Sequence, residues 1–190
     1  RIDKIIPTIN FLLSKKAKII IISHVGRPKG IVKSELTLQP IRDNLSSQLN
    51  ENVRLEKTNI FNLKKSELFN DAEEKIVILE NIRFYPEEEI NNEKFSEHLA
   101  KLGDIYVNDA FSCSHREHAS VTSITKFIPS YSGLQINSEV EALKKITTEI
   151  KKPITCIIGG SKISTKIDII KNLIPKFDNK IGRAHVWTPV

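Results

Sequence analysis

Three stretches of the sequence place cationic residues directly after a short apolar run. Lys18–Ser23 leads into His24 and Arg27, and Lys75–Glu80 leads into Arg83. The third run begins at Ile105 and leads into a loop that carries Asn108, Asp109, His115, Arg116 and His118. Guanidinium groups make paired hydrogen bonds to carboxylate and phosphate, and an open parallel sheet gathers its ligand site at the carboxyl ends of its strands. These residues, with Arg1, predict an anion pocket.

Each of these residues, taken alone, also has a plainer interpretation. An Arg in a loop commonly covers apolar surface with its stem, which would account for Arg27 or Arg83. His24 would suit a packed core, and His118 is expected to hold its loop rather than touch a ligand. The occurrence of an Arg after three separate strands favours the pocket.

A second candidate site is the glycine-rich loop Gly159–Lys166, between an apolar run at Ile154–Ile158 and a predicted helix from about Ser164 to Leu173. Glycines at such a turn let backbone N–H groups approach phosphate at the helix N-terminus. The spacing does not match a Walker A loop. From spacing alone, an ordinary strand–helix turn with Ser164 near the N-cap is the favoured interpretation.

Composition restricts the class of protein. The 190 residues are 39% hydrophobic, which suffices for a packed core. The 29 Lys and Arg stand beside 23 Asp and Glu, a balance typical of a solvated surface rather than a nucleic-acid footprint. Cys113 and Cys156 lie far apart with no metal-ligand spacing, so no metal site is predicted and a reducing, cytoplasmic location is expected. No apolar run reaches the length of a membrane span.

The order of the predicted elements indicates the fold. Unalternating apolar strands and amphipathic helices, such as Leu38–Leu49, follow one another along the chain. This pattern predicts an α/β fold: a three-layer parallel sheet with helices on both faces, Rossmann-like. Pro86–Asn92 is expected to be an acidic loop, Val121–Leu134 irregular, and Ser138–Ile150 a helix that ends before Pro153.

Four blocks of the sequence resemble, in order, the signature motifs of the phosphoglycerate kinase family. They are Ser23–Gly30, Leu79–Tyr85 with Glu87–Glu89, Tyr106–Phe111 with His115 and Arg116, and Gly159–Lys166. The resemblance implies a truncated two-lobe kinase that transfers a phosphoryl group reversibly between 1,3-bisphosphoglycerate and ADP, giving 3-phosphoglycerate and ATP in glycolysis. It implies a substrate lobe over residues 1–136 that lacks its first strand, an interdomain helix over 137–152, and the start of the nucleotide lobe over 153–180.

The resemblance also implies roles for individual residues. The substrate would be held by Arg1, His24, Val25, Gly26, Arg27, Arg83 and Arg116. Mg-ATP or Mg-ADP would be held by Gly160, Ser161, Lys162 and Lys166. Arg1 and Lys162 would flank the transferring group as catalytic residues. Arg83 and Arg116 are expected in exposed loops, so that replacing either with Ala would weaken binding and leave the fold intact.

The family likeness further implies a monomer that binds small molecules and neither nucleic acid nor membrane. The competing interpretation is a non-catalytic, basic Rossmann-like module that binds anions or nucleic acid. The sequence contains no Met and begins inside a predicted helix, so a fragment without activity of its own is expected. Residues 181–190 depart from the family pattern and resemble a translated sequencing adaptor, which predicts a non-native tail.

Overall fold

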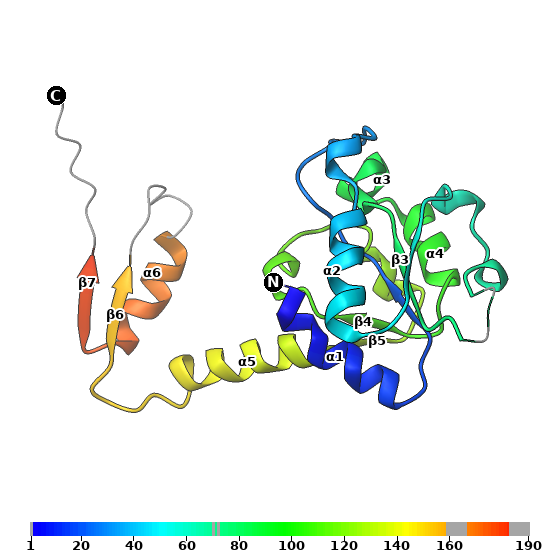
Figure 1. Cartoon of the computed structure of the whole chain (residues 1–190). Coiled ribbons are helices and arrows are strands. Elements are labelled where there is room, and N and C mark those ends of the chain that lie inside the picture. Colours follow the sequence, from blue (N-terminus) through cyan, green and yellow to red (C-terminus); the bar gives the residue numbers. More distant parts are fainter. Residues whose placement is uncertain (1, 70, 72, 159–166, 183–190) are drawn as a thin grey trace, which may run out of the picture. The chain divides into compact units, whose positions relative to one another are not determined.

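The computed structural model describes residues 2–69, 71, 73–158 and 167–182. They form two compact units, Arg1–Asn137 and Ser138–Val190. The α-helices are α1 (Ile2–Ser14), α2 (Gln39–Leu49), α3 (Pro86–Glu89), α4 (Glu93–Lys101), α5 (Leu134–Thr147) and α6 (Ile167–Leu173) (Figure 1). The strands are β1 (Ile19–Ile21), β2 (Val53–Glu56), β3 (Ile76–Leu79), β4 (Tyr106–Asn108), β5 (Ser130–Ser132), β6 (Thr155–Ile158) and β7 (Asn179–Gly182). The longer connections contain short 3₁₀ turns, such as Ile82–Phe84 after β3.

The first unit is built on a parallel sheet of order β1-β3-β2, in which Ile19 and Val53 both pair with Ile76. All four residues of the central strand β3 are buried, as expected for a strand covered on both faces. Ile76 and Ile78 pack into one hydrophobic cluster with residues of α1 and α2. Val77 and Leu79 alternate to the other face and join a second cluster.

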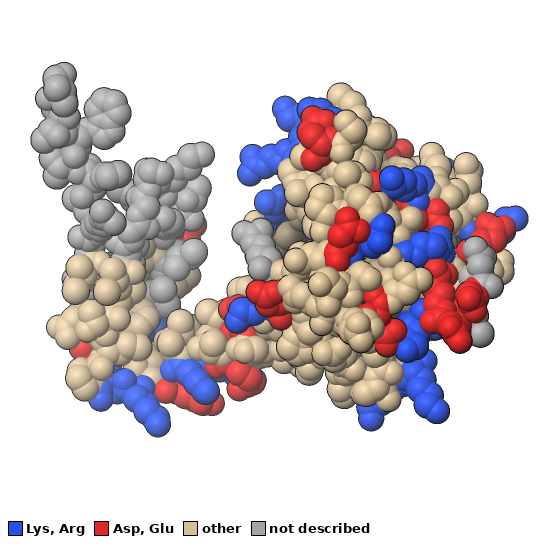
Figure 2. Space-filling view, viewed as in Figure 1, with Lys and Arg blue, Asp and Glu red and all other residues tan. Residues whose placement is uncertain are grey.

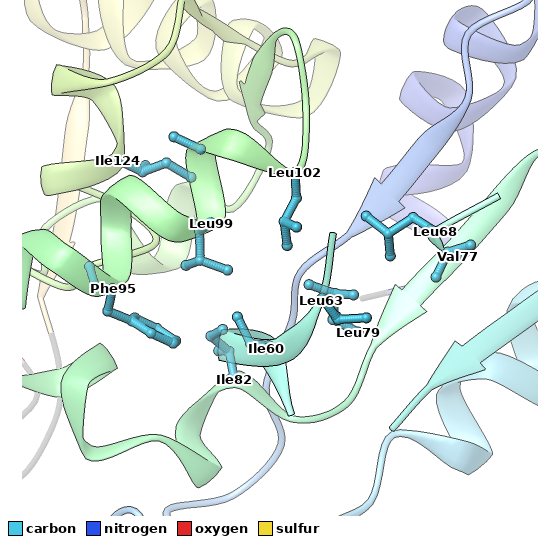
Figure 3. Close-up of a cluster of buried hydrophobic side chains, with 12 residues drawn as sticks. Ile60, Leu63, Leu68, Val77, Leu79, Ile82, Phe95, Leu99, Leu102 and Ile124 are labelled. Carbon is cyan, nitrogen blue, oxygen red and sulfur yellow. The ribbon is translucent and has the colours of Figure 1, made fainter. Parts of the chain in front are cut away.

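This second cluster is formed chiefly by α4 and the connection after β2. Figure 3 shows Phe95 and Leu99 of α4 near Ile60 and Ile82. The helices α1 and α2 on one face and α4 on the other give the three layers around β3 (Figure 1). The predicted α/β class and three-layer arrangement are confirmed.

Two connections differ from the sequence predictions. Pro86–Asn92 is not wholly a loop, because its first residues form the short helix α3, where proline suits the first turn and the three glutamates favour the positive end of the helix. Val121–Leu134 is not irregular throughout, because β5 pairs in parallel with β4.

The remaining elements are α5 and those that follow it in the chain. This helix begins at Leu134, earlier than predicted, and ends at Thr147. In the second unit, β6 pairs in parallel with β7, which includes the first two residues of the predicted tail. No helix in the described parts of the chain is both long and apolar enough to cross a membrane.

Candidate functional site

The carboxyl ends of β1 and β3 lie side by side and carry two loops that are hydrogen-bonded to each other. The Ile82 amide donates to the Ser23 carbonyl over 3.1 Å, and the Gly30 amide donates to the Arg83 carbonyl, also over 3.1 Å. Because the strands are parallel neighbours, residues that follow each of them meet at one sheet edge. This edge is the candidate anion site.

Asn81 joins the loop after β1 to the loop after β3 by hydrogen bonds. Its side chain is fully buried, and its Nδ2 donates to the carbonyls of Val25 and Leu36, each over 2.9 Å. Its Oδ1 accepts from the Arg83 amide over 3.1 Å. Asn81 was not among the predicted site residues, although it stands inside one of the quoted motifs. It fixes the backbone around Gly26 and Arg83.

Arg83 is buried, which corrects the expectation of an exposed loop residue. Its side chain is 3% exposed, and Nη1 donates to the Gly26 carbonyl over 3.2 Å. Nε lies 3.6 Å from Oε1 of Glu89. Among the described residues, Nε and Nη2 have no hydrogen-bond partner. A buried guanidinium with free donors is costly unless an anion completes its bonding, so this residue fits an anion site well.

The pKa of His24 reflects the positively charged side chains around it. Its pKa is lowered from 6.5 to about 4, mainly by burial and then by Arg83, Arg116 and His118 in that order, against an opposing effect of Glu89. His24 is therefore neutral near neutral pH. Arg83, which follows β3, and Arg116, which follows β4, are thus close enough to His24, which follows β1, to act on its charge.

Glu88 organises the loop after β4. This buried carboxylate accepts from the Ser120 amide over 2.9 Å and from Ser120 Oγ over 2.7 Å. Its Oε1 lies 3.6 Å from Nδ1 of His118, and its carbonyl accepts from the Ala119 amide. Burial is the main cause that lowers the pKa of His118, and Glu88 opposes it. These contacts agree with the predicted loop-holding role of His118. The run of glutamates after Pro86 is the sequence signal for α3, although the sequence alone predicts a loop there.

Asp109 connects β4 to α1 and α5. Its Oδ2 accepts from Thr8 Oγ1 over 2.5 Å, and its Oδ1 accepts from the amides of Gln135 and Ile136. A carboxylate at a helix N-terminus satisfies free N–H groups and the helix dipole, which explains why α5 begins where it does. A Cβ on Gly133 would lie 2.3 Å from this carboxylate, so only glycine leaves room there.

The other predicted site residues divide into two groups. Val25 and Gly26 contribute the carbonyls described above, Arg27 is exposed in the same loop, and Arg116 is half-buried, with its amide bonded to the Cys113 carbonyl over 2.9 Å. The second group lies outside the described residues: Arg1, Gly160, Ser161, Lys162 and Lys166. Among the described residues, no group of three or more His, Cys, Asp and Glu side chains could hold a metal ion.

Comparison with known proteins gives a consistent result. The model of the family "Phosphoglycerate kinase" matches residues 1–182. A phosphoglycerate kinase of Dictyoglomus turgidum is 43% identical over 189 residues, which are 99% of this chain and 48% of that protein. One from Wolbachia pipientis is 47% identical over 177 residues, which are 93% of this chain and 44% of that protein. The chain therefore spans about half the length of the curated relatives it matches.

Solved structures agree. The phosphoglycerate kinase of Coxiella burnetii superposes with a TM-score of 0.82 at 35% identity, over 96% of this chain and 46% of that one. The enzyme of Pyrococcus horikoshii gives a TM-score of 0.83 at 26% identity, over 96% of this chain and 47% of that one.

Proposed function

Because the chain belongs to the phosphoglycerate kinase family, we propose that it forms the substrate half of an enzyme that transfers a phosphoryl group between 1,3-bisphosphoglycerate and ADP. The products of this reversible step are 3-phosphoglycerate and ATP. The observation that carries the proposal is Arg83, whose buried guanidinium keeps two donors free beside His24.

The chemistry of the substrate fits this arrangement. 3-Phosphoglycerate presents a carboxylate and a phosphate, which are anionic groups that a cluster of cations can hold apart and orient. Phosphoryl transfer depends mostly on such positioning and on neutralising charge. The assigned substrate residues are Arg1, His24, Val25, Gly26, Arg27, Arg83 and Arg116. The nucleotide, with Mg²⁺, is assigned to Gly160, Ser161, Lys162 and Lys166.

Three of the four aromatic residues in the motif blocks do not offer the stacking surface that the alternative, a nucleic-acid-binding module, requires, and Phe111 is the exposed one. Phe84 is buried, and Tyr85 packs against Phe61 and Phe95, with ring centroids 6.2 and 5.4 Å away. Tyr106 donates its hydroxyl to the Ser120 carbonyl. Base-stacking platforms require exposed rings. Basic and acidic side chains also alternate over the face of the first unit that Figure 2 shows.

The proposed organisation follows the family. Residues 1–136 form the substrate lobe, 137–152 the interdomain helix and 153–180 the start of the nucleotide lobe. The division into units at Asn137 and Ser138 supports the first boundary. A monomer in the cytoplasm completes the proposal, and the free thiols of Cys113 and Cys156 fit a reducing compartment.

Calorimetric titration with 3-phosphoglycerate tests the proposal. Arg116→Ala should weaken binding about 10- to 100-fold, the equivalent of one charge-assisted hydrogen bond. Lys101→Ala is the control, because it also removes one positive charge and Lys101 is exposed on α4, where it pairs with Glu97. Arg83 should be changed to Lys rather than Ala, since Ala would also remove the donor to Gly26. Equal affinity for all variants would contradict the assignment.

A further inference from the structure

The short helix α3 brings one acidic side chain to the cationic pocket. Oε1 of Glu89 lies 3.6 Å from Arg83 Nε, and the Glu89 side chain remains 36% exposed. Burial is the main cause that lowers the pKa of His24, Arg83 and His118, and the Glu89 carboxylate opposes it in all three, so its field reaches three residues of the pocket. A carboxylate among residues that would bind an anionic substrate opposes that binding, and its presence requires an explanation.

The position of Glu89 is fixed by the packing of α3. On one side, Gly30 has a φ of +76°, and a Cβ there would lie 2.9 Å from Cβ of Pro86. On the other side, the buried Glu88 is bonded to Ser120. Because α3 is held between the loops that follow β1 and β4, Glu89 is directed to Arg83 rather than left free on the surface.

The donors of Arg83 that make no hydrogen bond are covered by other atoms of the protein. Nε and Nη2 have almost no exposed surface and no hydrogen-bond partner among the described residues. A ligand oxygen can therefore reach them only if a covering side chain shifts. Glu89 forms an ion pair with Nε, and its exposure leaves it room to turn toward solvent.

We infer that Glu89 is an internal counter-ion of the pocket, which an anionic substrate displaces from Arg83. This inference rests on the proposed function and adds a positioning residue to it. Glu89 stabilises Arg83 through a partly exposed ion pair and weakens the pocket for every anion that uses this guanidinium. Since substrate and product of a reversible reaction share the pocket, weaker ground-state binding favours turnover and release.

Glu89→Gln tests the inference, with Glu87→Gln as its matched control. Both changes remove one charge from α3, but Glu87 adds to the effect of burial in raising the pKa of Tyr85, whereas Glu89 acts on His24, Arg83 and His118. At fixed ionic strength, Glu89→Gln should bind inorganic phosphate and 3-phosphoglycerate about two- to five-fold more tightly, the range of a partly exposed ion pair. Glu87→Gln should bind both as the unchanged chain does. Unchanged or weaker binding by Glu89→Gln would overturn the inference.

A second measurement separates this inference from the proposed function. The pKa of His24, followed by NMR with no anion added, should fall in Glu89→Gln and stay constant in Glu87→Gln. A constant His24 pKa in Glu89→Gln would overturn the inference without any ligand. If Glu89→Gln lowers the His24 pKa but the unchanged chain does not bind 3-phosphoglycerate, Glu89 is still the counter-ion of the pocket. Only the assignment of the substrate is then wrong.

Discussion

Replacing Asn81 with Ala should destabilise the first unit more than any surface substitution. The change removes two hydrogen bonds donated to the Val25 and Leu36 carbonyls and one accepted from the Arg83 amide. At about 1 kcal/mol net for each bond, the loss is about 3 kcal/mol. The loss approaches about 5 kcal/mol if no water molecule replaces the lost donor at the Val25 and Leu36 carbonyls.

Urea unfolding, followed by circular dichroism, measures this loss as a lower transition midpoint at constant slope. Asn44→Ala is the control, because Asn44 lies exposed on α2 and should change the free energy of unfolding by less than about 0.5 kcal/mol. The affinity for 3-phosphoglycerate should fall as well, since the loop that carries His24 and Gly26 loses its anchor. A loss below about 1 kcal/mol would show that Asn81 does not join the loops.

Three further changes test the supporting contacts. Asp109→Ala should lower the free energy of unfolding by about 1–2 kcal/mol in urea titrations, the cost of a lost helix cap; an unchanged value would refute the capping role. Glu88→Ala should cost about 2–3 kcal/mol by the same assay, because Ser120 keeps two unpaired donors; a smaller effect than Glu93→Ala would contradict this. The pKa of His24 is about 4 in the folded chain against 6.5 unfolded, so the unfolded state binds the extra proton between these values. Stability should therefore fall as pH decreases through this window, and less steeply in His24→Gln.

The sequence was sufficient to predict a parallel sheet, and the anion site that it predicted at the carboxyl ends of the strands stays a prediction. The run Ile76–Leu79 has no polar alternation, and only a strand covered on both faces accommodates it. Since β1 and β3 are parallel neighbours, His24 and Arg83 had to follow them at the same edge. These inferences depend on local pattern and on the geometry of parallel sheets.

Contacts between distant segments could not be predicted in the same way. The burial of Arg83 depends on loops that close over it, and Asp109 reaches Thr8 across 101 positions of the chain. The start of α5 follows from that cap rather than from its own apolar pattern. Likewise, Glu88 and Glu89 are adjacent in sequence, but one is buried against Ser120 and the other faces Arg83. Their roles arise from tertiary packing.

The most direct test of the substrate pocket is an NMR titration of the ¹⁵N-labelled chain with 3-phosphoglycerate. Saturable shifts are predicted for the backbone amides of Gly26, Arg83 and Arg116. The amide of Lys75, before the amino end of β3, should not move. Saturable shifts that leave Gly26, Arg83 and Arg116 unchanged, or no saturable shift at millimolar ligand, would contradict the assignment of this pocket to 3-phosphoglycerate.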